Sequence, residues 1–251
     1  GIPVNERGEW LLAVRASDGT ERLMASGRTV LRTGTPSPIP GRSLVDLSPW
    51  HDLNDLGGHA ALVRLSGDPA TDTLLLKNSA KLAQEGDVLP ALAPAALVEL
   101  GDRVCCTNAG PVFWRARTDG PAGSNEAFLR DREPFLQSGV TRIAGQLVSS
   151  FDPGEGSYEV SADGRFWLGR VNLEGRRVLL RADFGAAVPL PGCTPNAATL
   201  RHTGGLVLAG ATIELTLDGP VAPGALGSVQ FSLGAAGPGD CGIAAPFGEL
   251  L

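Results

Sequence analysis

The sequence contains few of the side chains on which catalytic and metal sites depend. It has three histidines and four cysteines, and its only lysines are Lys77 and Lys81. It contains no Gly-x-Ser-x-Gly elbow, no P-loop and no dinucleotide-binding fingerprint, since Gly154-Glu-Gly156 alone indicates a turn. The usual local signals of nucleophilic and phosphate chemistry are therefore missing.

Basic charge and long apolar runs are also scarce. The net charge of −6 and the pI near 5.1 argue against a nucleic-acid partner, which would need clustered Lys and Arg. The longest apolar stretch, residues 88–98, is too short for a membrane helix and contains Pro90 and Pro94. No charged and then apolar signal region opens the chain, so export would place Gly1 after a processing site or inside a larger precursor.

The few candidates for metal binding have simpler interpretations. His51, Asp52 and His59 would need a further ligand, so we interpret them as a polar turn. His202 is expected at an exposed strand end. Two aspartate pairs could supply oxygens to Ca²⁺ but lack a ligand ladder, and we interpret them as solvated turn residues: Asp68 with Asp72, and Asp119 with Asp131. We expect no metal, no cofactor and no catalytic residue.

Glycine and proline, by contrast, are abundant in the chain. It has 34 Gly and 19 Pro, which interrupt it too often for long helices. A hydrophobic content of 43% with 19% charged residues is typical of a folded core rather than a disordered chain. These numbers predict short strands joined by turns.

A repeat organises most of the chain. A turn-like segment ending in glycine recurs and is followed each time by an apolar strand; its copies are Asn5–Gly8, Asn54–Gly57, Thr107–Gly110 and Ser161–Gly164. The lead glycines Gly8, Gly57, Gly110 and Gly164 are 49, 53 and 54 residues apart. A second marker closes each unit, and its glycines Gly34, Gly86, Gly139 and Gly192 are 52, 53 and 53 residues apart. Two independent series with one period indicate tandem repeats.

Each unit is predicted to be a small antiparallel meander. The lead turn precedes a strand, and hairpins at 18–19, 66–69, 119–120 and 174–175 lead to return strands. Short strands at 44–47, 96–100 and 146–150 follow the closing markers. About four strands per unit predicts an all-β protein of four tandem propeller-like blades, although a β-solenoid or open array would look similar. The expected divisions are 1–49, 50–102, 103–156 and 157–192.

The repeat resembles the tandem NxxGxxxF-type repeats of secreted and surface-anchored proteins from planctomycete-like and myxobacteria-like bacteria. Glu85-Gly86-Asp87 with Pro90 matches the acidic loop of those repeats, and residues 33–36 are a degenerate form of it. The likeness covers roughly residues 2–192. It implies export and display at the cell surface, and supplies no catalytic residues.

Residues 193–251 look like the small C-terminal β-domain, expected to be sandwich-like, that many such exported proteins carry. A disulfide between Cys193 and Cys241 is predicted to tie its ends together, since a domain of this size has a marginal core. Cys105 and Cys106 are adjacent, which would strain a bond between them. Two small buried thiols are the favoured interpretation there.

Aromatic residues recur on the first strand of the repeats, at Trp10, Trp114 and Trp167. Their recurrence at similar positions favours a core between units over a sugar-stacking surface. A binding site remains open as an alternative, at a concave surface lined by Trp50, Asp102 or Arg117. No binding residue is assigned by a motif.

Three functions are compatible with this pattern. A non-catalytic extracellular or cell-surface assembly protein, part of a filament or surface layer, is favoured, with itself or another surface protein as partner. A glycan- or protein-binding module and a polysaccharide-acting enzyme are alternatives. One further expectation follows: the sheet containing Trp10 should be completed by a strand from outside residues 2–192, because only residues 1–4 precede Asn5. That strand could come from a neighbouring protomer, from the C-terminal segment folding back as in ring closure, or from a region that precedes Gly1.

Overall fold

The protein is built from antiparallel β-sheets joined by short turns. The computed structural model describes residues 2–152 and 157–184 with their side chains, and beyond them the backbone of short strands between 188 and 250. Within this part there is no α-helix, and none that could span a membrane. The all-β prediction is confirmed.

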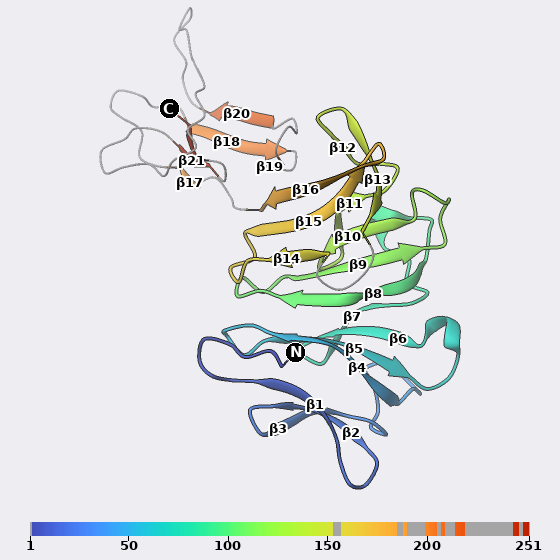
Figure 1. Cartoon of the computed structure of the whole chain (residues 1–251). Coiled ribbons are helices and arrows are strands. Elements are labelled where there is room, and N and C mark those ends of the chain that lie inside the picture. The colour runs from blue at the N-terminus through green and yellow to red at the C-terminus, as the bar shows by residue number, and fades with distance from the viewer. Residues whose placement is uncertain are drawn as a thin grey trace, which may run out of the picture.

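Four sheets follow one another along the chain (Figure 1). Sheet I comprises β1 (Leu11–Arg15), β2 (Glu21–Ala25) and β3 (Arg28–Arg32). Sheet II comprises β4 (Leu44–Leu53), β5 (His59–Leu65), β6 (Thr73–Lys77) and β7 (Ala80–Gln84). Sheet III comprises β8 (Leu97–Cys106), β9 (Val112–Thr118), β10 (Glu126–Arg130) and β11 (Glu133–Gln137). Single 3₁₀ turns, η1 (Pro69–Thr71) and η2 (Pro90–Leu92), lie in the loops.

Sheet IV is more elaborate. It comprises β12 (Arg142–Ile143), β13 (Gln146–Phe151), β14 (Tyr158–Val160), β15 (Phe166–Leu173), β16 (Arg176–Asp183) and β19 (Val207–Leu208). The remaining strands form two small sheets: β17 (Val188–Pro189) with β21 (Ile243–Ala245) and β22 (Gly248–Leu250), and β18 (Thr199–Gly204) with β20 (Glu214–Asp218). Cys193 and Cys241 lie outside the described residues, and so does Gly192.

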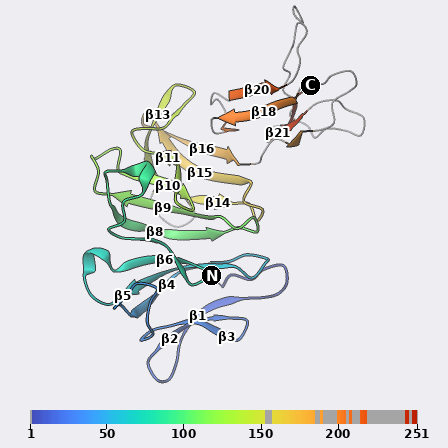
Figure 2. The same cartoon turned by 180° about the vertical axis from the view of Figure 1, so that it is seen from behind.

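The four sheets stack face to face in chain order, as Figures 1 and 2 show from opposite sides. One apolar cluster lies between each neighbouring pair: Leu11 and Leu23 meet Val63 between sheets I and II. Between II and III, Leu62 meets Trp114, and between III and IV, Phe128 meets Trp167. Sheets II and III therefore bury both faces, which explains why β5, β6, β9 and β10 are nearly continuous apolar runs.

The sequence alternation decides which cluster each residue joins. On β9, Phe113 points toward sheet IV and its neighbour Trp114 toward sheet II, because successive side chains of a strand face opposite ways. Trp114 and Trp167 are fully buried, and the Trp114 Nε1 donates to the Asp131 carbonyl at 2.6 Å. Trp10 is only half-buried, because no described sheet covers the outer face of sheet I.

The lead turns form a hydrogen-bonded ladder along the stack. The Asn5 Nδ2 donates to the Asn54 carbonyl at 2.9 Å, and the Asn54 Nδ2 donates to the Thr107 carbonyl at 2.8 Å. One residue further along each turn, the Asp55 N–H donates to Asn108 Oδ1 at 2.7 Å. The Asn108 N–H then donates to the Ala162 carbonyl at 2.6 Å. Each turn is therefore fixed to the next.

The lead glycines and the closing glycines of the repeat occupy backbone conformations that favour glycine. The four lead glycines have φ values of +72° to +102°, a region that favours glycine. The closing glycines Gly34, Gly86 and Gly139 also have positive φ. Their N–H groups donate to the carbonyls of Leu44, Leu97 and Val148, each at 2.7 Å. Each closing turn thus fixes the start of the next sheet.

The strand that enters each lead turn, here called the lead strand, carries a bulge. In β4 the register shifts between Leu47 and His51, and in β8 between Leu100 and Val104. In sheet IV the corresponding interruption separates β13 from β14. The predicted divisions near residues 50 and 103 fall inside β4 and β8, because the lead strands begin before the lead turns that the sequence pattern emphasises.

We expect Asn54→Ala to lower the free energy of unfolding by about 3 kcal/mol. The change removes the bond to Thr107 and leaves the N–H groups of Leu56 and Gly58 without the Oδ1 that now accepts from both. Urea denaturation measures the effect. Asn125→Ala is the control, since its side chain makes no hydrogen bond in the described structure. Equal effects of the two changes would mean that the ladder adds nothing to stability.

Candidate binding site

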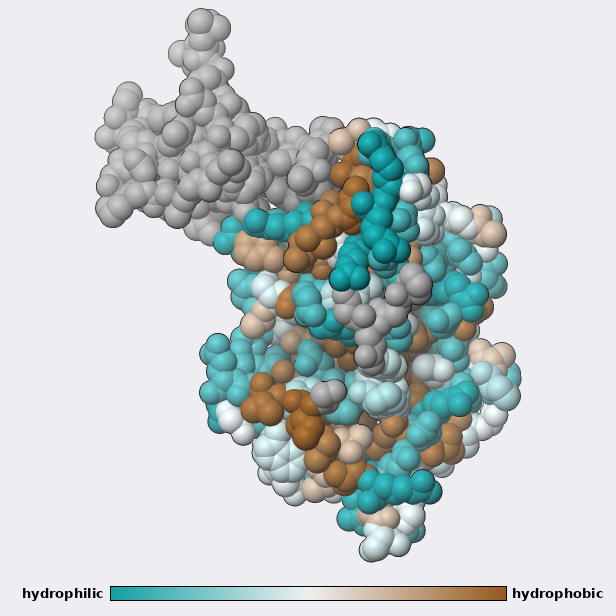
Figure 3. Space-filling view, in the orientation of Figure 1, coloured by the Kyte–Doolittle hydropathy of each residue, from teal (hydrophilic) through white to brown (hydrophobic). Residues whose placement is uncertain are grey.

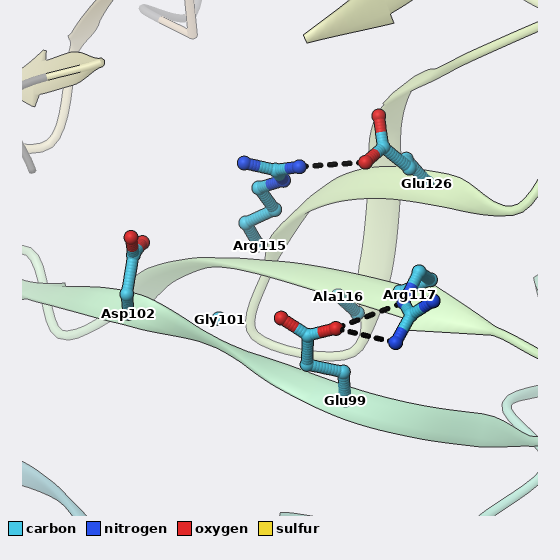
Figure 4. Close-up of a pocket in the computed structure, with 7 residues that line it drawn as sticks. All are labelled: Glu99, Gly101, Asp102, Arg115, Ala116, Arg117 and Glu126. Carbon is cyan, nitrogen blue, oxygen red and sulfur yellow. Dashed lines mark hydrogen bonds and ion pairs between the residues drawn. The ribbon is translucent and has the colours of Figure 1, made fainter. Parts of the chain in front are cut away.

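A concave site lies at the bulge of β8. It is a pocket of about 300 Å³ with β8 and β9 along its floor, shown in Figure 4. Its lining residues are Glu99, Gly101, Asp102, Arg115, Ala116, Arg117 and Glu126. Two of the three residues that the sequence suggested for a binding surface, Asp102 and Arg117, are among them. Trp50 instead packs against the core between sheets II and III.

A row of charged residues crosses three strands beneath this pocket. Arg117 lies opposite Glu99 of β8 on one side and opposite Glu126 of β10 on the other. The Arg117 Nε donates to Glu99 Oε2 at 2.8 Å. We call this acid–arginine–acid arrangement the charge row. It fixes the edge strand β8 to the sheet through side chains as well as the backbone.

Arg115 connects the pocket to sheet IV. Its Nη2 donates to Glu126 Oε1 at 2.6 Å, and its Nη1 donates to the Asp152 carbonyl at 3.3 Å. Both partners of the Arg115–Glu126 pair are largely buried, with side chains 17% and 21% exposed, so solvent screens this pair less than the exposed Arg117–Glu99 pair. One wall of the pocket is therefore rigid.

The bulge presents one carboxylate with no partner. Asp102 forms no hydrogen bond or ion pair within the described residues and stands apart from both ion pairs in Figure 4. The neighbouring Gly101 lets β8 lie close to β9 at the bulge, since a Cβ there would lie 2.9 Å from the Arg115 carbonyl oxygen. Three carboxylates and two guanidinium groups leave the pocket with one negative charge. It can accept hydrogen bonds from hydroxyl or ammonium groups.

The ionisable side chains of the pocket are three carboxylates and two guanidinium groups. None of its lining residues is a serine, cysteine, histidine or lysine. Glu99 and Glu126 are each paired with an arginine. Its polar groups are suited to binding.

The expected polar turn at His51, Asp52 and His59 is wrong, because His51 and Asp52 lie in β4 and His59 begins β5. No group of three His, Cys, Asp or Glu that could hold a metal occurs within residues 2–152 and 157–184. Burial lowers the pKa of both His51 and His59, which favours neutral rings. His202 falls in β18, and its side chain lies outside the described residues.

The four turn aspartates all have structural partners. Asp68 Oδ1 accepts from the Ala70 N–H and caps η1, while Asp72 pairs with Arg64 at 3.1 Å. Asp119 Oδ1 accepts from the Ala96 N–H at 2.8 Å. Asp131 pairs with Lys77 at 2.9 Å. These carboxylates hold strands and loops together.

Cys105 and Cys106 are free and buried, as the sequence favoured. Burial raises the pKa of both thiols to about 12, so neither is a thiolate at neutral pH. The Cys106 N–H donates to Asp52 Oδ2 at 2.7 Å, a bond between sheets II and III. No sequence motif indicated this role of the Asp52 carboxylate beyond its place beside His51.

Comparison of the chain with known proteins does not assign it to a family. No family model, no curated protein and no solved structure matches the chain.

Asp52 is expected to make stability fall as pH rises. Burial raises its pKa, with the N–H groups of Cys106 and Leu53 opposing the shift. The protonated form is therefore favoured by folding, and its contribution is lost as pH rises through the folded pKa. Asp52→Asn keeps the acceptor for Cys106, so the variant should be more stable than the parent at pH 7 and lose that advantage toward pH 4.

Asp18→Asn is a control for which the expected change in stability at pH 7 has the opposite sign. A side-chain hydrogen bond from Thr20 holds the Asp18 pKa down at about 2, so Asp18 contributes stability above its unfolded pKa that disappears at lower pH. Asp18→Asn should be the less stable protein at pH 7. Thermal unfolding from pH 2 to pH 7 measures both differences, and an Asp52→Asn difference that does not change with pH would contradict the assignment.

Proposed function

We propose that the protein is a non-catalytic structural or assembly module that is displayed outside the cell and joins other β-sheet units end to end. The observation that carries the proposal is the outer face of sheet I. Every interface within the stack buries an apolar sheet face against the preceding sheet. Sheet I has apolar residues on its outer side, among them Val4 and Trp10, and no sheet within the described residues covers them.

The difference between the covered and the uncovered sheet faces appears in the exposed fractions of equivalent residues of the repeat. Val4, Leu53 and Cys106 each pair with the second residue after a lead glycine, namely Trp10, His59 and Val112. Leu53 and Cys106 are 8% and 9% exposed, because the preceding sheet covers them. Val4 is 63% exposed. Figure 3 shows apolar side chains on the surface around the N-terminal residues and β1.

The occupant that suits this face is another sheet of the same kind. The face continues the series of interfaces already present within the molecule, and those interfaces are built from aliphatic and aromatic residues at alternate positions. The blade-like character of the units is part of this proposal. The sheets form a row, and no strand of sheet I pairs with one of sheet IV within the described residues. The resemblance to repeats of surface-displayed bacterial proteins supports the extracellular location.

The test is the state of association. We expect the protein to form larger species as its concentration rises, by multi-angle light scattering, and Val4→Glu to prevent this by placing a charge on the apolar face. Val140→Glu is the matched control, because Val140 is 57% exposed but lies in a loop after β11. A protein that stays monomeric at all concentrations, or equal effects of the two changes, would refute self-assembly through this face.

The pocket at β8 supports a second candidate, a glycan-binding module. Asp102 is a free acceptor beside two fixed ion pairs, an arrangement that can receive sugar hydroxyl groups. A glycan array should then show selective binding that Asp102→Asn abolishes and Glu133→Gln, at an exposed site on β11, preserves. Binding that is indifferent to Asp102→Asn would exclude this pocket as the glycan site.

A further inference from the structure

The two arginines of the pocket at β8 are both occupied by oxygens of the protein itself. Arg117 donates to Glu99 Oε2 through Nε and through Nη2, each at 2.8 Å. Arg115 donates through Nη2 to Glu126 Oε1 at 2.6 Å and through Nη1 to the Asp152 carbonyl at 3.3 Å. A ligand in this pocket therefore finds its strongest donors already engaged.

The carboxylates of β8 leave acceptors open. Glu126 on β10 uses both oxygens, since its Oε2 accepts from the Phe151 N–H at 3.4 Å. Within the described residues, Glu99 Oε1 has no partner, and Asp102 has none on either oxygen. In Figure 4 the Glu99 oxygen without dashed lines lies on the Asp102 side of that carboxylate. The open polar groups along β8 are thus acceptors that await a donor.

Charge selects among the ligands that can donate to these oxygens. Three carboxylates and two guanidinium groups give the pocket a net charge of −1. A phosphate, sulfate or carboxylate ligand would bring more negative charge, whereas a primary ammonium group brings three N–H donors and a positive charge. None of the seven lining residues is aromatic, so the pocket lacks the ring faces that bind a quaternary ammonium group. The pocket chemistry fits a primary ammonium group.

The dimensions of the pocket favour a short saccharide over a lysine side chain. Its volume of about 300 Å³ is at the lower end of the range for small-molecule sites. Asp102 lies three residues beyond Glu99 on β8, at most about 10 Å away along an extended strand. A lysine carries its donors at one end only. Linked sugar rings carry hydroxyl groups along their whole length and can reach both carboxylates.

We propose that the pocket at β8 binds an amino sugar with an unacetylated amine, with its ammonium group on Asp102 and its hydroxyl groups donating to Glu99 Oε1. This inference deepens the glycan-binding candidate function and rests on it. One ammonium group neutralises the pocket, so the other contacts are those of neutral hydroxyl groups.

The probes are a linear tetramer of glucosamine and its fully N-acetylated counterpart, which share a backbone and differ in charge. Isothermal titration calorimetry with the intact protein should show saturable binding of the glucosamine tetramer. The acetylated tetramer should bind about tenfold more weakly, because it lacks the charged hydrogen bond. Asp102→Asn should weaken binding of the glucosamine tetramer about tenfold for the same reason and remove the preference between the two probes.

Two further variants separate this contact from the general attraction of a polycation to a protein of net charge −6. Glu133→Gln removes the same unit of charge from an exposed position on β11 and should leave binding unchanged. Arg117→Gln frees Glu99 from its partner and makes the pocket more negative, so it should strengthen binding of the glucosamine tetramer about threefold. Stronger binding cannot result from a loss of folding, so this variant keeps the test decisive if Asp102→Asn proves unstable.

A pentalysine peptide separates the sugar from a lysine side chain as the source of the ammonium group. We expect it to bind at least tenfold more weakly than the glucosamine tetramer. Equally tight binding of pentalysine that Asp102→Asn abolishes would overturn the inference and assign the pocket to a lysine-bearing peptide.

The remaining outcomes keep the inference distinct from the candidate function on which it rests. Equal binding of the two tetramers would overturn the ammonium contact and leave glycan binding in place. Binding of neither tetramer, with selective binding of another glycan on the array, would also overturn the inference while supporting a glycan-binding module. Binding of no glycan at all would remove both.

The sign of the Arg117→Gln effect is the most direct check of the charge argument. Weaker binding of the glucosamine tetramer by this variant, in a protein whose thermal unfolding is unchanged, would overturn the proposed role of the open carboxylates.

Discussion

The hydrogen bond that each lead turn makes to the next is the interaction on which the rest of the structure depends. The amide groups of Asn5 and Asn54 bond the following turn, and Asn108 continues the contact to the last one. These bonds fix the lateral position of one sheet over the next. Because a strand's side chains alternate between its faces, that position decides whether apolar residues such as Trp114 meet an apolar neighbour.

The same stacking explains both candidate functional features. A sheet inside the stack receives a cover on each face and a complete lead strand, so its charge row is closed by Glu99 or Asp46. In sheet I, at the end of the described stack, Val4 and Arg15 are both exposed. The pocket at Asp102 arises differently, from a bulge that β4 and β8 share in position but not in sequence. Association and ligand binding would therefore use separate parts of the repeat.

Two carboxyl groups between the sheets, Asp46 and Asp52, make the stability of the stack depend on pH. Asp52 ties sheet II to Cys106 of sheet III through a carboxyl whose pKa burial raises. Burial also raises the pKa of Asp46, and nearby Glu21 of sheet I adds to that shift. Folding favours the protonated form of both groups. The packing of sheets I, II and III on one another is therefore expected to be more stable in mildly acidic solution than at neutral pH.

The repeat, the all-β class and the turns could be predicted from the sequence alone. This was possible because glycine at positive φ and apolar residues at alternate positions are local requirements, visible at Gly57 or along residues 73–77 without knowledge of any neighbour. The sequence also indicated Asp102 and Arg117 as possible binding residues, though not why they meet. The tertiary structure was needed to show that the bulge of β8 brings them together, and that Trp10 is only half-buried while Trp114 and Trp167 are fully buried. These outcomes depend on register between strands and on which sheet lies next to which, and residues about 50 positions apart carry no local mark of either.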